Sequence, residues 1–231
     1  SAPAKRLSAH PLAIARTYWD VMKNKQFMLF TISMGFAGAG MFAYIAGSPF
    51  VFMQEYGVSP RIYGIIFGCN ALGLISAAQL NTLLISRFSM ASILKCSNIA
   101  QICAGALLLV DAIFRLGGLF GILIPLFLYL FSSSLMRPNG TVMAMAPFKS
   151  CAGTASALMG ALQFVLAAGA SFAMGLFHSQ SPVPMAAAIM FCGLAGAFTC
   201  LLALKAAGPE NGRSPVKKDE IEASEPPLIE D

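Results

Sequence analysis

Charged side chains are scarce in this sequence of 231 residues, because only 11% of the residues are charged while 57% are hydrophobic. A soluble domain usually carries charge on about a quarter of its residues, so the composition excludes most soluble folds. The stretch from Phe27 to Leu204 contains just eight charged residues, namely Glu55, Arg61, Arg87, Lys95, Asp111, Arg115, Arg137 and Lys149. They divide it into apolar runs close to the ~20 residues that a helix needs to cross a bilayer.

Sequence signals of catalysis and metal binding are also missing. None of the six cysteines forms a CxxC pair, so we expect no disulfide and no metal site. No GxGD or HExxH motif occurs, and Ser156 and His178 are roughly 33 Å apart by helical rise, too far for a nucleophile and its base. We therefore expect no catalytic residue, no enzyme activity and no bound cofactor.

The N-terminal residues lack the basic, apolar and small-residue regions of a signal peptide. Because the chain begins with Ser1 rather than Met, we expect it to be a segment of a longer protein or a processed product.

The chain divides into three parts. Residues 1–26 are basic and amphipathic, with Tyr18 and Trp19, and are predicted to form a cytoplasmic linker lying partly on the membrane. Residues 27–204 are predicted to form an all-α bundle of six transmembrane helices at about 27–52, 60–85, 92–114, 118–136, 152–177 and 182–204. Residues 205–231 combine prolines with many charges and are predicted to be disordered.

The positions of the basic residues predict the orientation of this bundle. Thirteen of the fifteen Lys and Arg residues fall in the two terminal segments and the loops on the same side, and only Arg61 and Arg115 fall on the other side. Basic loops stay in the cytoplasm, so we expect both termini there. The net charge of +5 therefore reflects the orientation of the protein in the membrane rather than a basic binding surface. For this reason we do not expect a nucleic-acid partner.

Polar residues near the middle of the predicted helices are the candidate binding residues. Asn70, Gln101, Tyr129 and Gln163 fall near mid-membrane, and Tyr44 falls in the outer half of the first helix. An amide in hydrocarbon needs a partner or water, so interhelical hydrogen bonding and substrate contact are equally open for each. Neutral donors among Phe, Met and Leu suit amphipathic molecules better than sugars or ions.

No carboxylate lies deep in the predicted membrane segments. Asp111 falls near the outer end of the third helix, and the i, i+4 spacing predicts an ion pair with Arg115. If the protein uses a proton gradient, we expect its coupling carboxylate to lie outside this segment. Small residues are dense, including a GxxxG at Gly64 and Gly68, which favours close helix packing, static or sliding.

Three runs resemble one family. FAYIAGSPFVFMQEYGVSPRIYGIIFGCNALG (42–73), LFLYLFSSSLMRPNGTVMAMAPF (126–148) and AGTASALMGALQF (152–164) are similar to helices seven and eight, ten, and eleven of the bicyclomycin/chloramphenicol-resistance (Bcr/CflA) branch of the major facilitator superfamily. The resemblance implies the C-terminal half of a twelve-helix, proton-coupled multidrug exporter in the bacterial inner membrane. It also implies that an N-terminal six-helix half is the partner, and that drug-like compounds are the substrates.

The resemblance also assigns residues. It implies that Tyr44, Asn70, Tyr129 and Gln163 line the substrate cavity, and that Gln101 is structural. Gly47 and Pro49 would belong to a bend that acts as an outer gate, since proline loosens a helix. Pro138 and Asn139 would act as hinge residues in a turn at the inner end of the tenth helix.

Two alternatives to drug export remain open. The chain could belong to an exporter of a small metabolite, or to a membrane module that packs on a partner without transporting anything.

Overall fold

The computed structural model describes residues 11–176 and 181–208, and every regular element within them is a helix. These elements are α1 (Pro11–Lys23), α2 (Lys25–Pro49), the π-helical η1 (Phe50–Glu55), α3 (Pro60–Arg87), α4 (Met90–Phe114), α5 (Gly118–Met145), the 3-10 helix η2 (Ala146–Cys151), α6 (Ala152–Leu176) and α7 (Val183–Ala207). The expected all-α membrane fold is confirmed.

Five continuous helical stretches of the described residues are long and apolar enough to cross a membrane. One of them, 118–176, has 59 residues. At 1.5 Å per residue this is far longer than a bilayer is thick, so it makes two crossings. The break lies in η2, where Phe148 leaves helical geometry at φ −118° and ψ 35°. The bundle therefore has six spans, in α2, α3, α4, α5, α6 and α7.

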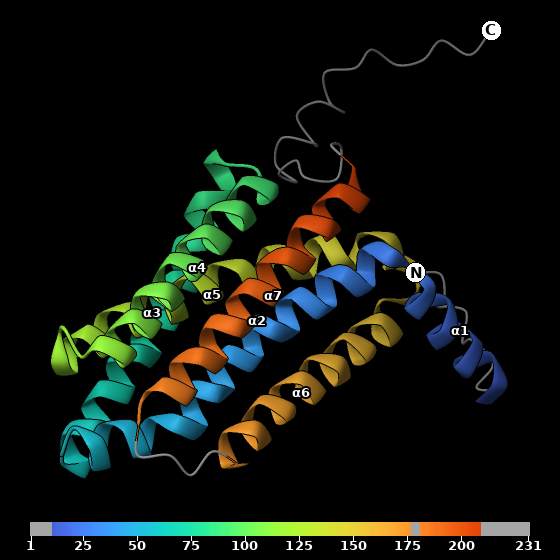
Figure 1. The fold of residues 1–231 in the computed structure, drawn as a ribbon. Coiled ribbons are helices and arrows are strands. Elements are labelled where there is room, and N and C mark those ends of the chain that lie inside the picture. The colour runs from blue at the N-terminus through green and yellow to red at the C-terminus, as the bar shows by residue number, and fades with distance from the viewer. Residues whose placement is uncertain (1–10, 177–180, 209–231) are drawn as a thin grey trace, which may run out of the picture.

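The helices pack around a central pair (Figure 1). α2 runs beside α7 and also packs on α6, while α4 packs on both α5 and α7. α3 packs mainly on α5 and barely contacts α4. Consequently α3 and α6 lie at the margins of the bundle. α6 buries only Ala155, Met159 and Ala167.

Two apolar clusters form the core, one at each end. The first includes Phe27, Met143 and Ala207 and lies at the end where the bundle begins and finishes. The second includes Phe52, Leu108 and Ile122 and lies at the opposite end. Lipid tails are as apolar as these side chains, so burying them between helices in a membrane gains little hydrophobic free energy. The stability of the bundle therefore depends on how closely the side chains pack.

Buried polar groups lie between the two clusters. Ser33 donates a 2.8 Å hydrogen bond to the carbonyl of Gly196, and Ser133 donates to the carbonyl of Ala37. Gln101 is 1% exposed, and its amide nitrogen has no partner within the described residues. Among the described residues, the middle of the bundle thus carries neutral polar side chains and no charged ones.

Side chains cap the N-termini of three helices, α2, α3 and α4. Asn24 accepts from the Phe27 N–H, Ser59 from the Ile62 N–H and Ser89 from the Ser92 N–H. These acceptors satisfy backbone donors that a helix start leaves free. The predicted boundaries are accordingly close to those observed.

One predicted boundary is wrong. The sequence places the inner end of the fourth span near Met136, with a turn through Pro138 and Asn139, but α5 continues to Met145. Pro138 lacks an N–H and so removes only one helical hydrogen bond, the one to the carbonyl of Ser134. Asn139 is fully buried, and a turn at this position would leave its backbone polar groups without partners. The side chains of Asn139 and Thr141 bond the carbonyls of Leu135 and Arg137 one helical turn earlier.

The predicted linker contains α1, a helix with Trp19 57% exposed and the Lys23 ammonium 5.4 Å from its ring centre. Such a pair suits a membrane interface, where an aromatic body meets water at its edge. Most of the predicted disordered tail, like His178, lies outside the described residues, and the three-part division stays a prediction.

Candidate functional site

The expected cavity residues of α2 and α3 meet directly. The Asn70 side chain donates a 3.1 Å hydrogen bond to the Tyr44 hydroxyl. Both side chains are buried, with 5% and 3% of their surface exposed, and the Phe67 ring stacks on Tyr44 at 5.9 Å. Each polar group thus has a partner in this conformation, while Phe67 is exposed towards the open side of α3.

A second bond links the same two helices one turn further out. The hydroxyls of Ser48 and Tyr63 are 2.9 Å apart, and the Tyr63 ring lies 6.2 Å from that of Phe52. The outer half of α3 is therefore tied to α2 by two neutral hydrogen bonds.

The inner half of α3 is tied to α5 instead. Ser134 donates a 2.7 Å hydrogen bond to the carbonyl of Leu74, and Asn139 donates a 2.6 Å bond to Asn81. Asn81 is 3% exposed and Asn139 fully buried. Asn139 was predicted as a hinge residue, and the structure places it in an interhelical bond inside a continuous helix.

Tyr129 and Gln163 do not join the Tyr44–Asn70 pair. Tyr129 is fully buried, its hydroxyl has no partner within the described residues, and a Cβ on Gly40 would overlap it. Gln163 is half-buried on α6, with its backbone against Gly35 of α2. The two residues therefore lie on different neighbours of α2, and their role as cavity residues stays a prediction.

The predicted outer bend coincides with a change of helix type. α2 ends at Pro49, and the next six residues form a π-helix in which the Tyr56 N–H bonds the carbonyl of Val51. Pro49 cannot donate to the carbonyl of Ile45, which loosens the helix at this point. Gly47 packs against Met185, where a Cβ would sit 3.0 Å from the Met185 Cγ. The gating role of this segment stays a prediction.

The predicted ion pair at the outer rim is wrong. Arg115 binds Glu55, with 2.6 Å between Nη2 and Oε1, and does not bind Asp111. Arg115 has a left-handed backbone at the end of α4, so its side chain no longer follows the helical face that carries Asp111. The Asp111 Oδ1 atom accepts a 2.6 Å bond from the Gly117 N–H instead.

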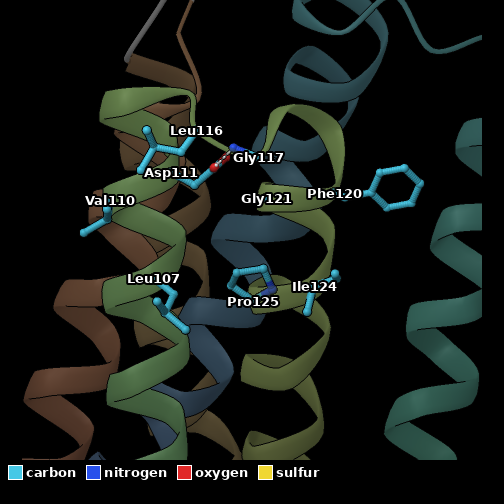
Figure 2. Close-up of a pocket in the computed structure, with 9 residues that line it drawn as sticks. All are labelled: Leu107, Val110, Asp111, Leu116, Gly117, Phe120, Gly121, Ile124 and Pro125. Carbon is cyan, nitrogen blue, oxygen red and sulfur yellow. Dashed lines mark hydrogen bonds between the residues drawn. The ribbon is translucent and has the colours of Figure 1, made fainter.

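Figure 2 shows the groove beside this turn, between the outer ends of α4 and α5. It measures about 480 Å³ and is lined by Leu107, Val110, Asp111, Leu116, Gly117, Phe120, Gly121, Ile124 and Pro125. A Cβ on Gly121 would overlap the Asp111 carboxylate. Asp111 thus closes the α4–α5 turn at the start of a helix, where negative charge is favourable, which is a structural role.

Tyr56 lies next to this rim, outside the spanning segments. Burial raises the pKa of its hydroxyl, and the carboxylates of Asp111 and Glu55 add to the rise while Arg115 opposes it. The hydroxyl therefore stays neutral above the pH at which tyrosine ordinarily ionises.

The sequence reading missed Tyr63 and Asn81, although α3 carries a signal for both. Counted from Tyr63, Asn70 comes seven residues later and Asn81 eleven residues after that, spacings that return to one face of a helix. The buried residues of α3, namely Asn70, Gly73, Ala77 and Asn81, follow that same face.

Comparison with known proteins gives the family. No family model matches the sequence. An uncharacterised MFS-type transporter of Bacillus subtilis, YdgK, is 33% identical over 191 residues, which cover 81% of this chain and 46% of that protein. The chain is homologous to the major facilitator superfamily transporters. It is a multi-pass membrane protein of that kind, and the predicted resemblance is confirmed.

Two further superfamily members bear on the branch. A bicyclomycin resistance protein homologue of Haemophilus influenzae is 25% identical over 178 residues, covering 77% of this chain and 44% of that protein. The multidrug transporter MdfA of Edwardsiella ictaluri is 36% identical over 73 residues, covering 30% of this chain and 18% of the transporter. The chain spans about half the length of the first two relatives, as expected for one half of a superfamily transporter.

Proposed function

We propose that this chain is the C-terminal half of a proton-coupled multidrug exporter that works by alternating access. One observation carries the proposal: the two marginal helices, α3 and α6, hold Asn70 and Gln163 and leave their outer faces unpacked. A Cβ placed on Gly64 or Gly68 of α3 would meet no atom, and the same holds for Gly160 of α6. In lipid, such small-residue faces suit close packing against other helices.

A second six-helix bundle seated on these faces would enclose the space between them. Phe67, which is exposed, would then line it from α3 in front of the buried Asn70, and Gln163 would line it from α6. Neutral amides among aromatic rings suit amphipathic, drug-like molecules, and the names of two relatives point the same way. No acidic residue lies at this depth within the described part of the chain, so the coupling carboxylate is assigned to the other half. The distribution of the basic residues supports a cytoplasmic side for both ends of the bundle, and the bacterial relatives support a bacterial inner membrane.

Efflux from cells tests the function, using the longer protein in which this chain follows an N-terminal half. Replacing both Asn70 and Gln163 by Ala is expected to lower ethidium and chloramphenicol efflux at equal expression. A Gln54→Ala variant is the control, because Gln54 is an exposed amide at the outer rim. Unchanged efflux in the double variant would show that Asn70 and Gln163 do not contact the substrate, and no efflux from the unaltered protein would favour a membrane module without a transport role. Efflux confined to one compact polar compound would favour a metabolite exporter.

A further inference from the structure

A second groove lies at the other end of the bundle, between α3 and α4 with α5 as its floor. It measures about 410 Å³ and is lined by Leu84, Phe88, Ser92, Ile93, Cys96, Ser97, Ala100, Leu128, Phe131, Ser132 and Leu135. It exists because α3 packs on α5 and barely contacts α4. Almost all of the lining is apolar, and the Phe88 ring is 54% exposed at its rim.

The face of α3 that lines this groove is not the face that would receive a second bundle. At about 100° per residue, Leu84 lies opposite Gly64 and Gly68 on the helix. A partner seated on the two glycines would therefore leave the groove open to the lipid.

Two basic residues lie next to lining residues in the sequence, near the α3–α4 turn. Arg87 precedes Phe88 and Lys95 precedes Cys96. Both side chains are exposed, and neither has an ion pair within the described residues. Long basic side chains can lay their stems along apolar surface and bring their charge to the headgroup level. α4 also begins here at Met90, and its N-terminus adds partial positive charge.

We infer that this groove binds an anionic phospholipid of the leaflet on the side where the bundle begins and ends. One acyl chain occupies the apolar cleft between α3 and α4, over Ala100 and Leu128. The phosphate lies between Arg87 and Lys95. Charge complementarity selects an anionic headgroup, because basic pockets between transmembrane helices attract such lipids.

The groove contains a cysteine that reports on its occupancy. Cys96 is exposed and lines the cleft, whereas Cys103 is exposed on the same face of α4, two turns further along and outside the lining. A bound acyl chain therefore shields Cys96 and leaves the exposure of Cys103 unchanged. The ratio of their alkylation rates measures occupancy within a single molecule.

The experiment uses the 231-residue chain, purified in mild detergent with added phosphatidylglycerol or phosphatidylcholine. Native mass spectrometry counts bound lipid, and peptide mass spectrometry follows maleimide labelling of Cys96 and Cys103. We expect phosphatidylglycerol to slow labelling of Cys96 relative to Cys103, and phosphatidylcholine to do so much less. The double variant Arg87→Gln, Lys95→Gln is expected to bind phosphatidylglycerol roughly ten-fold more weakly.

Two controls separate the site from general effects of charge and folding. Arg137→Gln with Lys149→Gln removes two basic charges elsewhere on the same side and should leave binding unchanged. Ala100→Phe fills the cleft, keeps both cations, and should release the lipid. Equal loss in the two charge variants, equal protection by both lipids, or full retention in Ala100→Phe would each overturn the inference.

Discussion

Asn139 on α5 donates a 2.6 Å hydrogen bond to Asn81 on α3, with both side chains buried in the inner half of the bundle. Together with the Asn70–Tyr44 bond in the outer half, it fixes a marginal helix at two heights to two different neighbours. If α3 moves relative to α2 during transport, the Asn70–Tyr44 bond breaks while the Asn81–Asn139 bond can persist.

The first prediction concerns the strength of the Asn81–Asn139 bond. Replacing either residue by Ala removes one buried partner, so both single variants should lose thermal stability in detergent. A double-mutant cycle should give a coupling of about 0.6–2 kcal/mol, the range of interhelical hydrogen bonds in membranes. Additive losses would show that the two amides do not interact. Thr82→Ala is the control, since Thr82 is exposed and bonds only the Gln79 carbonyl of its own helix.

The second prediction concerns Pro49 and the π-helix after it. Pro49→Ala restores an N–H that can bond the carbonyl of Ile45, so α2 should extend into the 50–55 segment. We expect this to slow turnover while drug binding to the purified protein changes little, because the change lies outside the Tyr44–Asn70 pair. Pro125→Ala is the matched control, because Pro125 also lies inside a helix but not in the segment of the expected gate. If Pro49→Ala transports at the normal rate, the segment is not a gate.

The third prediction concerns the outer-rim ion pair. Arg115 is 61% exposed at its side chain, so solvent screens its attraction to Glu55. Glu55→Gln should therefore cost less than about 1 kcal/mol of stability, and the loss should shrink further in high salt. Asp111→Ala should cost more, because Asp111 accepts the Gly117 backbone N–H and is only 7% exposed. Thermal melts at two salt concentrations measure both effects.

The sequence predicted the helical spans well for a physical reason. Backbone groups in lipid must be paired, so apolar runs between charges leave few options besides helices. It was misleading at Pro138, where a family turn was expected, because proline costs only one bond if neighbouring side chains and packing compensate. It was also misleading at Arg115, because the left-handed end of α4 redirects the side chain and no helical spacing applies beyond that point.

The candidate site was predictable only in part. Tyr44 and Asn70 were both identified because polar groups at mid-membrane need partners, yet their mutual bond depends on how α2 and α3 rotate. Tyr63 shares a helical face with Asn70, but Ser48 carried no comparable signal, since a hydroxyl near a helix end can bond water or backbone. Gln163 has no hydrogen-bonded partner among the described residues, which agrees with a site completed by helices outside this chain.

The last prediction tests whether a second bundle packs on α3. It compares Gly40, which faces the inside of this bundle, with Gly68, which faces open space. Gly40 faces Tyr129 inside the bundle, so Gly40→Ala should force a clash and cost about 1–3 kcal/mol of stability. Gly68 faces open space on α3, so Gly68→Leu should leave the melting temperature of this chain almost unchanged. In the protein with its N-terminal half, however, Gly68→Leu should obstruct packing of the second bundle and reduce co-purification of separately expressed halves. Normal co-purification and normal efflux in Gly68→Leu would place the second bundle elsewhere, because a leucine cannot fit where two helices approach at a glycine.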